Sequence, residues 1–522
     1  MTVRRRTMKT LITGLLTLAV VATAGATGAG QANAAVRPPP LGTATVLMID
    51  SHRTEAVTNA TRQFYQGRKI SVAGQPLGRV SIRRVTTYAG ADDAADGDKD
   101  IDSPLLDART IMHENGVYRM WLRSGSNVGY RESSDGIHWH KRDADSVILV
   151  KGVSGGSVVK YPSTGLYYLL GWSRALGRYV EMVSRDGLSF TRTNSFSGAL
   201  AQIGIYGDVI TASADPVNGS LHVFAKQRTI GLIPCARTTN DAGGRTFRVN
   251  TSGGSASARP NARQWRPASR VVTSDCADAQ SVPRTPGTNN PVQLYGATME
   301  RYGDQHLVFP WLYHVTKVGQ WGDGTIDTQI AATPSISNIG WTRPKANVKA
   351  PGGRLKRPVA VKRGPNGSWD DGMIFSVNLF NVGGRSRLYY NGWDSTHDVN
   401  IKGRKMSVGI VEWKQDRFMG IVTARKLYPS TVRTRAFRMT GGSRTLRVNT
   451  SVRAGKSMRA EVLDANTNRV LKGWTRNDST YVRGDQTNAA IRWRGKSLGR
   501  LGAKPIKIQF VYTGSFYSWK VR

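Results

Sequence analysis

The sequence predicts an all-β protein, a five-bladed β-propeller followed by a small β-sandwich. Three observations predict this class: an aromatic strand after a turn recurs five times, hairpins with Asp-Gly follow the first copies, and no long helical periodicity interrupts the repeats. Repeats of roughly 50 residues, each worth about four short strands, are typical of propellers, whose blades protect one another's edges. A β-sandwich alone would not repeat the same order of strand, arm and hairpin.

The repeats are defined by their apolar strands and by their turns. The five strands are GVYRMWL (116–122), GLYYLLGW (165–172), GSLHVFAK (219–226), GDQHLVFPWLYH (303–314) and SRLYYNGW (386–393). The first two lead to the hairpins SSDGIHW (133–139) and SRDGLSF (184–190). In such a hairpin the Asp bonds its own backbone and the Gly takes a positive φ, so Asp135 and Asp186 are predicted to be structural.

The N-terminus is predicted to direct export. Residues 1–34 combine a cationic start, an apolar stretch over 11–24 and the small residues Ala32, Asn33 and Ala34. This is the pattern of a secretory signal peptide that is cleaved after Ala34. No later segment approaches the ~18 consecutive apolar residues that a transmembrane helix needs. We therefore expect a bacterial protein that is secreted or held at the cell surface, without a transmembrane segment.

The two cysteines and a low-complexity segment lie close together in the sequence. Cys235 and Cys276 are the only cysteines, and in an oxidising compartment an even pair predicts a disulfide rather than a metal site or a nucleophile. The segment at about 251–290 is rich in Ser, Gly, Ala, Pro and Asn and is predicted to be a surface insertion before the fourth blade. The propeller is placed at 35–429.

Residues 430–522 alternate in polarity without the Asp-Gly hairpin, which predicts the β-sandwich. They hold 20 Lys and Arg against four Asp and Glu, a net charge of +16, within a chain of formal charge +39. A field of this sign favours polyanions such as teichoic or uronic polymers, anionic lipid or nucleic acid. A general bias toward Arg without a specific partner is the alternative. No nucleic-acid-binding signature accompanies the charge, so a specific nucleic-acid partner is not expected.

Several phrases resemble the catalytic domain of glycoside hydrolase families 32, 43 and 68, the invertases, arabinanases and levansucrases. They are YRMW with SSDGIHW, SWDDGMIF (368–375), LYYNGWDSTH (388–397), VGIVEWKQDRFMGI (408–421) and RVNTSVRAGKSMRAEVLD (447–464). The likeness is greatest to bacterial members that carry a C-terminal β-sandwich. It implies hydrolysis or transfer of a glycosyl group by carboxylates in the central funnel, where one carboxyl protonates the leaving oxygen and another acts as nucleophile or base.

Acids before or on the predicted innermost strands are the catalytic candidates: Asp107, Asp208, Asp371 with its neighbour Asp370, and Glu300. Each has a structural alternative. Asp107 can pair with Arg109, Asp208 can bond turn amides, and Glu300 can be a solvated hairpin residue. Asp370 and Asp371 can form a turn or hold a structural ion. The second blade offers no acid, and the chain lacks the WMNDPNG, RDP and EC phrases of the invertases.

Aromatic and polar residues near the last repeat are the candidates for substrate binding. Tyr390, Trp393 and His397 lie in the phrase most like the relatives, and aromatic faces stack on the C–H surface of sugar rings. Trp393 can equally pack between blades. His397 and His314 can be ligands or hydroxyl binders, or structural hydrogen-bonders. The chemistry requires no cofactor, a structural calcium ion is compatible with it, and the sequence names no metal.

Two hypotheses follow. The first is a secreted glycoside hydrolase that acts on a cell-wall or environmental polysaccharide. The second is a non-catalytic surface protein that binds a polysaccharide or an anionic cell-wall polymer, because the acid set matches the relatives only in part. A sialidase-like enzyme is a weaker third reading, because TNDAGGRTF (239–247) resembles an Asp box without a matching arginine triad.

Overall fold

The fold was analysed in a computed structural model of the 522-residue chain. The structure describes residues 40–82, 107–124, 127–140, 142, 149–162, 164–173, 175–193, 209–217, 219–229, 244–252, 265–266, 271–272, 274, 278, 292–317, 323–335, 341–344, 357–397, 405–425, 427–439 and 444–522. Over these ranges no helix is long and apolar enough to cross a membrane. The predicted signal peptide, Asp208, Cys235 and Cys276 lie outside the described residues, so the leader and the disulfide stay predictions.

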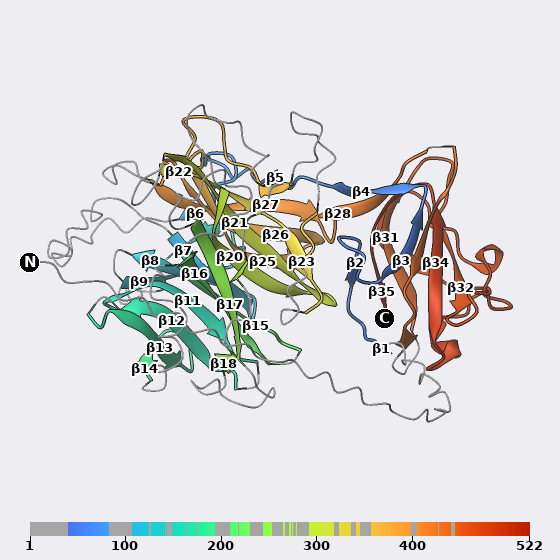
Figure 1. Cartoon of the computed structure of the whole chain (residues 1–522), viewed down its shortest axis with the longest axis horizontal. Helices are drawn as coiled ribbons and strands as arrows, with labels where there is room; N and C mark the ends of the chain where they lie inside the picture. Colours follow the sequence, from blue (N-terminus) through green and yellow to red (C-terminus); the bar gives the residue numbers. More distant parts are fainter. Residues whose placement is uncertain are drawn as a thin grey trace, which may run out of the picture.

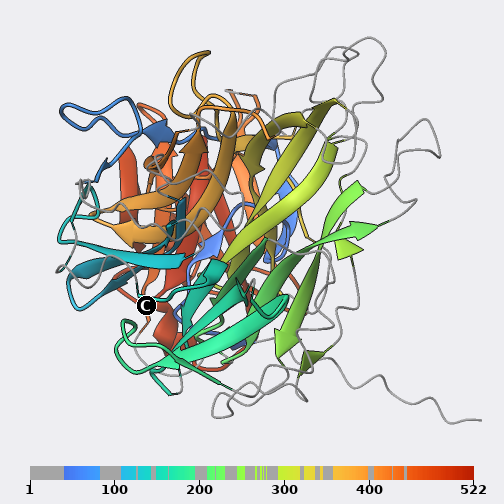
Figure 2. The same ribbon diagram turned by 90° about the vertical axis from the view of Figure 1, so that its left-hand side faces the viewer.

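Five strands form a closed ring at the centre of a propeller, which confirms the predicted fold class. They are β7 (Asp107–Glu114), β11 (Val153–Lys160), β15 (Ile210–Ala214), β20 (Val292–Tyr302) and β25 (Met373–Val382). Each contacts the next, and β25 contacts β7, which closes the circle. In Figure 2 their sheets follow one another around a common centre, from cyan through green and yellow to orange.

Side chains join the five inner strands around the ring. Thr110 on β7 bonds the backbone of Val158 on β11 (2.9 Å), and Ser157 bonds the backbone of Ala212 on β15 (3.1 Å). Thr298 on β20 meets Ser376 on β25, with 2.6 Å between their hydroxyl oxygens. Since inner strands of neighbouring blades cannot pair through their backbones here, these polar side chains satisfy the backbone groups that face the centre.

Blades I and II follow the predicted order of strand, arm and hairpin. Blade I contains β7, β8 (Val117–Ser124), β9 (Asn127–Ser133) and β10 (His138–Trp139), which pairs in parallel with β6 (Ser81–Ile82). Blade II contains β11, β12 (Tyr167–Ser173), β13 (Arg178–Ser184) and β14 (Thr191–Arg192). The predicted turn roles are confirmed: Asp135 Oδ1 accepts from the backbone of Ile137 and His138, and Asp186 repeats this pattern.

Blade III takes in part of the segment predicted as a surface insertion. It contains β15, β16 (Leu221–Thr229), β17 (Gly244–Ser252), β18 (Trp265–Arg266) and β19 (Val271–Val272). Both β18 and β19 pair with β17, and Asp278 is fully buried against Arg343 (2.6 Å). The described parts of 251–290 therefore belong to the body of the fold. Their polar, small-residue composition gives no strand pattern, so β18 and β19 were not predicted.

Blades IV and V share one bridge between their sheets, Ile326 opposite Met373. Blade IV contains β20, β21 (Gln305–Lys317), β22 (Asp323–Gln329), β23 (Ala331–Thr333) and β24 (Val359–Val361). Blade V contains β25, β26 (Arg385–Trp393) and β27 (Met406–Lys414). Its outer strand is β5 (Arg68–Lys69), which precedes the first blade in the chain. An N-terminal strand thus completes the last blade.

The sandwich has two sheets, and both contain N-terminal strands (Figure 1). One sheet has the order β33 (Asp485–Ile491), β31 (Leu446–Val452), β35 (Gly514–Val521), β28 (Met419–Thr423) and β4 (Ala60–Phe64), with β2 (Val46–Leu47) also on β35. The other has the order β3 (Thr54–Thr58), β29 (Ser430–Thr434), β34 (Ile506–Tyr512) and β32 (Arg459–Asp464). β1 (Pro40–Leu41) pairs with β30 (Arg438–Met439), and η6 (Arg476–Asp478) and η7 (Leu498–Leu501) are short 3₁₀ turns.

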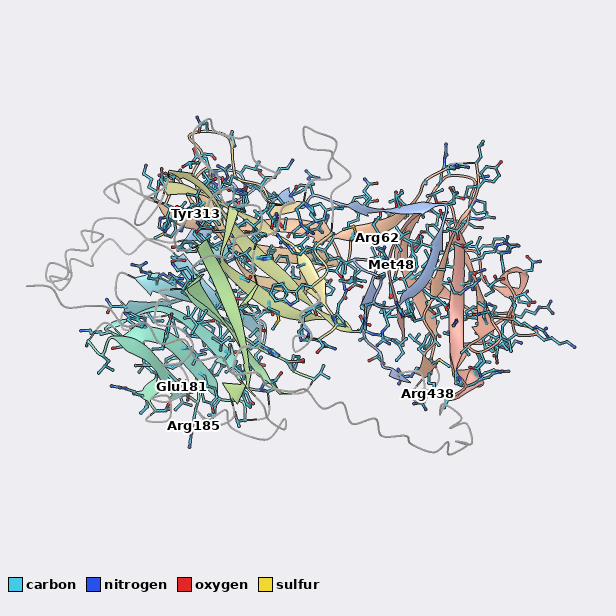
Figure 3. All side chains as sticks on the ribbon, in the orientation of Figure 1. Met48, Arg62, Glu181, Arg185, Tyr313 and Arg438 are labelled. Carbon is cyan, nitrogen blue, oxygen red and sulfur yellow. The ribbon has the colours of Figure 1, made fainter. Side chains whose placement is uncertain are left out.

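These pairings move the boundary between the two parts of the chain. Residues 40–64 and β28, assigned to the propeller by sequence, pair with the sandwich instead. Met48 and Arg62 lie beside the sandwich strands in Figure 3. Asp416, at the turn between β27 and β28, accepts hydrogen bonds from Tyr302 of blade IV (2.6 Å) and Ser518 of the sandwich (2.9 Å). One buried carboxylate therefore ties the two parts together.

Candidate active site at the strand starts

The five inner strands begin at the same end of the ring, which we call the start end. Contacts between neighbours fix their direction. Thr110 meets Val158 near the middle of β7 and β11, and Glu114 meets Lys160 (2.9 Å) where both strands finish. On β20 and β25, Thr298 meets Ser376 and Glu300 meets Asn378, and Asn378 also bonds the Ile111 backbone of β7. Asp215 after β15 meets His306 just beyond the end of β20. Because the strands run side by side in the same direction, the residues that open them converge. Side chains at the start end can therefore act on one bound molecule.

Asp107 is the first residue of β7 and lies at the start end. Its side chain is buried, Oδ1 accepts a hydrogen bond from Asn391 Nδ2 (2.7 Å), and Oδ2 pairs with Arg109 Nη2 (2.5 Å). Asn391 also bonds both backbone groups of Ala108 (2.8 Å each). The carboxylate is thus held in one orientation by blade V, and the pair with Arg109 expected as an alternative is present.

An aromatic group from blades IV and V lies at the same end. Asn391 stands opposite Phe375 in blade V, and the Phe375 ring packs on Tyr295 (6.0 Å between centroids) and Trp393 (5.2 Å). Tyr295 is the bulged residue of β20, and its hydroxyl meets His397 Nε2 (2.9 Å). We call Tyr295, Phe375, Trp393 and His397 the aromatic group. It contains two of the three residues predicted to bind substrate.

A cation and a second ring complete this group. Lys226 of blade III places Nζ 4.1 Å from the centre of the Tyr295 ring, a cation–π contact. Tyr313, labelled in Figure 3, is fully buried and packs on His397, with 5.2 Å between the ring centroids. Residues of blades I, III, IV and V therefore lie at the start end of the ring.

Asp370 is held in a buried ion pair away from the aromatic group. Its Oδ2 lies 2.5 Å from Lys69 Nζ of β5 and accepts a hydrogen bond from the Tyr390 hydroxyl (2.8 Å). Tyr390 is fully buried, stacks on Trp369 with 5.6 Å between centroids, and its pKa is raised well above the usual value by burial and by Asp370. The sequence placed Tyr390 in the substrate site, but its ring has no surface left for a sugar.

Asp371 has the turn role that was its alternative. Its Oδ2 accepts a hydrogen bond from the backbone of Gly367 (2.6 Å), and its carbonyl accepts one from Arg363 (2.7 Å). The neighbouring Asp370 is already neutralised by Lys69. These contacts do not fit a calcium ion held by the two acids, because an ammonium group occupies the position that the cation would take.

Glu300 lies deeper in the ring than Asp107. It accepts a hydrogen bond from Asn378 Nδ2 (2.5 Å), which is three residues further along β25 than Phe375. At a rise of about 3.3 Å per residue, this places Glu300 roughly 10 Å from the level of Asp107. Burial raises the pKa of Glu300 to about 7, against hydrogen bonds from Asn378 and the Leu379 backbone that lower it. It does not face Asp107 across the start end.

His314 is a structural hydrogen-bonder. Its Nε2 lies 3.0 Å from Asp327 Oδ2, and Arg363 Nε lies 3.1 Å from the other oxygen of that carboxylate. Burial raises the pKa of Asp327, but the hydrogen bond and charge of His314 outweigh it and leave the pKa lowered. This pair joins β21 to β22 within blade IV.

Sequence reasoning missed Asn391, Tyr295, Phe375 and Lys226. Asn391 and Phe375 lie inside phrases that carried the resemblance, and a polar residue within an aromatic strand was the available signal for Asn391. Tyr295 reaches the group because a bulge between Leu294 and Gly296 shifts the register of β20. No pattern in the sequence marks that bulge.

Comparison with known proteins gives a likeness at the level of shape. No protein-family model and no curated protein matches the chain. Among solved structures, a putative glycoside hydrolase from Bacteroides ovatus ATCC 8483 is 14% identical, with a TM-score of 0.35 over 60% of this chain and 88% of that one. An endo-arabinase from Bacteroides thetaiotaomicron VPI-5482 is 13% identical, with a TM-score of 0.36 over 59% and 94%.

An exo-inulinase from Aspergillus awamori is 12% identical, with a TM-score of 0.32 over 80% of this chain and 96% of that one. TM-scores and identities of this size carry no functional argument. The class that the fold and the site define is an all-β propeller with a buried carboxylate beside an aromatic group, and the function is argued from those residues.

Proposed function

We propose that the chain is a glycoside hydrolase that acts on a polysaccharide at the start end of the propeller. The observation that carries this proposal is the position of Asp107, which opens the inner strand of blade I and is oriented by Asn391 and Arg109. A carboxylate fixed in this way serves as nucleophile or as the base that activates water. The resemblance of the sequence to glycoside hydrolases supports the same assignment.

The aromatic group supplies the binding surface in this proposal. Trp393 and His397 are half-buried, and Tyr295 and Phe375 each expose 7% of their surface. Ring faces stack on the C–H surface of a sugar, while the His397 imidazole and the Lys226 ammonium bind hydroxyl groups. The mechanism also needs an acid, and we assign it to Asp208, which precedes β15 by two residues in the sequence.

The test is a screen of cell-wall and plant polysaccharides for released reducing sugar. Asp107→Asn and Asp208→Asn are each expected to lower the rate at least ~100-fold, because each removes a group that transfers a proton or forms a bond in the transition state. Asp371→Asn, whose carboxylate only closes a turn, is the matched control and keeps the rate. An Asp107→Asn protein of unchanged activity would overturn the assignment.

A non-catalytic carbohydrate-binding protein is the second candidate. It is favoured because Asp107 is the one member of the predicted acid set that the described residues place beside the aromatic group. In this case Trp393→Ala weakens retention of the chain on an insoluble polysaccharide, while no polymer yields sugar. The two candidates separate in the same screen, since only the first predicts products that disappear with Asp107→Asn.

We further propose that the sandwich holds an anionic polymer. Tyr481 is 53% exposed and has two guanidinium groups near its ring, with Arg459 4.8 Å and Arg483 5.9 Å from the ring centre. Arg459 also reaches Asn477 Oδ1 (3.2 Å). Two cations on an exposed ring fit a polymer that carries both sugar faces and negative charge. The net charge of +16 over 430–522 adds long-range attraction.

Retention on a teichoic or uronic polymer is expected to fall steeply between about 50 and 500 mM salt, as screening shortens the reach of the charges. Arg459→Gln with Arg483→Gln should weaken retention more than Arg469→Gln with Arg500→Gln, which removes the same charge from exposed positions elsewhere on the sandwich. Equal effects would show that total charge alone acts. Export itself is tested by N-terminal sequencing of the released protein, expected to start at Ala35.

A further inference from the structure

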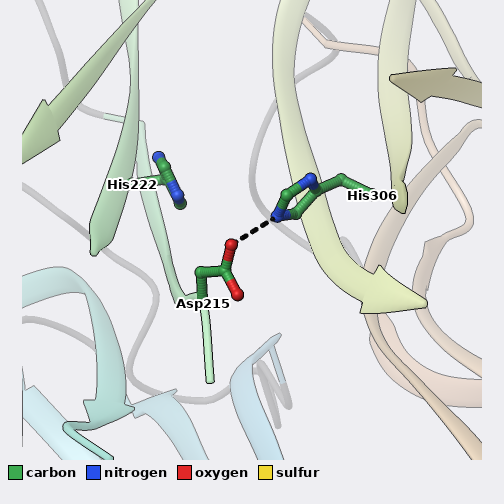
Figure 4. A group of neighbouring side chains, drawn as sticks. All are labelled: Asp215, His222 and His306. Atoms are coloured by element: carbon green, nitrogen blue, oxygen red, sulfur yellow. Dashed lines mark hydrogen bonds and ion pairs between the residues drawn. The ribbon is translucent and has the colours of Figure 1, made fainter. Parts of the chain in front are cut away.

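Three buried side chains meet between blades III and IV, at the end of the ring opposite the start end (Figure 4). Asp215 follows the last residue of β15, His222 is the second residue of β16, and His306 is the second residue of β21. They expose 2%, 3% and 3% of their surface, and one ligand atom from each lies within 4.8 Å of the others.

The contacts of the three residues are specific. Asp215 Oδ2 lies 3.1 Å from His306 Nε2, and Oδ1 accepts the backbone N–H of Val217 (2.9 Å). His222 Nε2 lies 2.8 Å from Ser220 Oγ, and the two imidazole rings are 5.9 Å apart at 74°. Arg301 Nη1 is 3.7 Å from Asp215 Oδ2, beyond hydrogen-bonding distance. That oxygen is therefore still able to coordinate.

The nitrogen of His306 that faces the cluster is Nε2, because it lies 3.1 Å from Asp215 Oδ2. Nδ1 lies on the other side of the ring and makes no hydrogen bond with the described residues.

The cluster offers two imidazoles and one carboxylate, all of them buried. This is the donor set that Zn²⁺ takes in proteins with three protein ligands and a water.

We propose that Asp215, His222 and His306 bind one Zn²⁺ ion. Tetrahedral coordination at 2.0–2.2 Å brings ligand atoms to about 3.3 Å from one another, close to the present separation of Asp215 and His306. A small inward movement of His222 completes the set, with a water as fourth ligand. The ion pins the turn of blade III that contains Asp215 to the first turn of blade IV. It lies at the far end of the ring from Asp107, so it takes no part in the reaction proposed there.

The rest of blade IV contains a natural control. His314 and the half-buried Asp327 form a pair with a similar distance, 3.0 Å between Nε2 and Oδ2, but Arg363 occupies the position of a third ligand. A His–Asp hydrogen bond that only stabilises the fold has this arrangement. The cluster at Asp215 differs by its second histidine and by the distance of its arginine, since Arg301 is 3.7 Å from the carboxylate.

The experiment uses the full chain, purified without a histidine tag and treated with chelator. Addition of Zn²⁺ is expected to give one bound ion per chain by elemental analysis. It should raise the unfolding midpoint by about 3 °C at a hundredfold excess over the dissociation constant. Co²⁺ at the same site should give the visible absorption of a tetrahedral or five-coordinate centre, and Zn²⁺ should displace it.

His222→Gln and His306→Gln are each expected to weaken Zn²⁺ binding at least tenfold and to remove the Co²⁺ absorption, while His314→Gln leaves both unchanged. If a variant fails to fold, the stoichiometry and Co²⁺ spectrum of the unaltered chain decide the question. A chain that binds no stoichiometric ion, or loses binding equally with His314→Gln, would show that the cluster is only a hydrogen-bonded pair.

Discussion

Three acids predicted to be catalytic illustrate how a residue's surroundings decide its role. Asp107 is oriented by an amide and a guanidinium beside the aromatic group. Asp370 is neutralised by Lys69 in an apolar setting. Glu300 faces the interior of the ring with only neutral donors, and burial raises its pKa to about 7. The sequence shows that each acid lies before or on an inner strand. It does not show which side chain each carboxylate contacts, and that contact decides its role.

Glu300 predicts a stability that falls with rising pH. Its pKa in the folded chain, about 7, lies above the ordinary value of 4.5, so between these pH values the folded state binds more protons than the unfolded state. The free energy of unfolding therefore decreases from about pH 4.5 to above pH 7, by roughly 1–3 kcal/mol from this group. Glu300→Gln should match the unaltered chain near pH 4.5 and exceed it at pH 8 in urea unfolding.

Glu412→Gln is the control for this measurement, because Glu412 on the outer strand β27 is paired with Arg387 (2.8 Å). It should give no gain at pH 8. If Glu300→Gln were less stable than the unaltered chain at pH 8, the carboxyl would have to be ionised and supported in the fold, contrary to its neutral surroundings.

Within the site, the sequence predicted which residues lie near the starts of inner strands, but not which way their side chains point. Asp107, Trp393 and His397 lie at the start end, as their positions in the repeats predicted. Tyr390 is only three residues from Trp393, but successive side chains of a strand point to opposite faces, and its face is the buried one between blades IV and V. Tyr295 was missed because its direction depends on a bulge.

At the scale of elements, the fifth blade depends on a strand of two residues. β5 pairs with β27, and Lys69 at its end forms the buried pair with Asp370. The backbone pairs alone are few, so the side-chain contact fixes the position of the strand. The ion pair between Lys69 and Asp370 therefore holds β5 in place as the outer strand of blade V.

Lys69→Met is expected to lower the free energy of unfolding by about 3 kcal/mol, because it leaves a buried carboxylate without its cation. Thermal or urea unfolding measures this loss. Asp370→Leu added to Lys69→Met should recover much of it, since no charge is then left buried. Lys414→Met is the control: its pair with Asp485 is exposed, and its loss should cost less than about 1 kcal/mol.

The same elements show what repeat analysis can and cannot find. Each blade's first three strands are contiguous in sequence and carry an aromatic core, so the repeats predicted them. β5, β6, β18 and β19 have two residues each. β5 and β6 pair with strands far along the chain, and β18 and β19 lie in the low-complexity segment and pair with β17. A two-residue strand is too short to show a periodic pattern, and it is recognised as a strand only from its pairing in the structure.

At the scale of the whole molecule, the sandwich is built from both ends of the chain. Leu41, Val46 and Met48 share one apolar core with Trp493, Trp519 and Phe516. Residues 40–64 were placed in the propeller by sequence, and their strands TEAVT and ATRQF are polar and show no alternation that would predict a sandwich strand. The sandwich was predicted correctly in class but without four of its strands.

A chain that ends at residue 429 should therefore fail to fold cleanly. Its N-terminal strands and β28 would lose their partners and expose the apolar residues 41, 46, 48 and 421. We expect it to bind a hydrophobic dye and to aggregate during purification, whereas a chain that spans 40–522 unfolds cooperatively. A soluble 40–429 protein that unfolds in one sharp transition would contradict the shared core.

The pairing of β2 with β35 also sets an order of events in time. Val46 pairs with Trp519, so β2 cannot join its sheet until nearly the last residues of the chain are present. Synthesis and any passage through a membrane both deliver the chain from its N-terminus, and contacts of such sequence separation form slowly. Assembly of the ring and the sandwich is thus completed only after the whole chain has emerged, which favours a molecule that stays unfolded until delivery is finished.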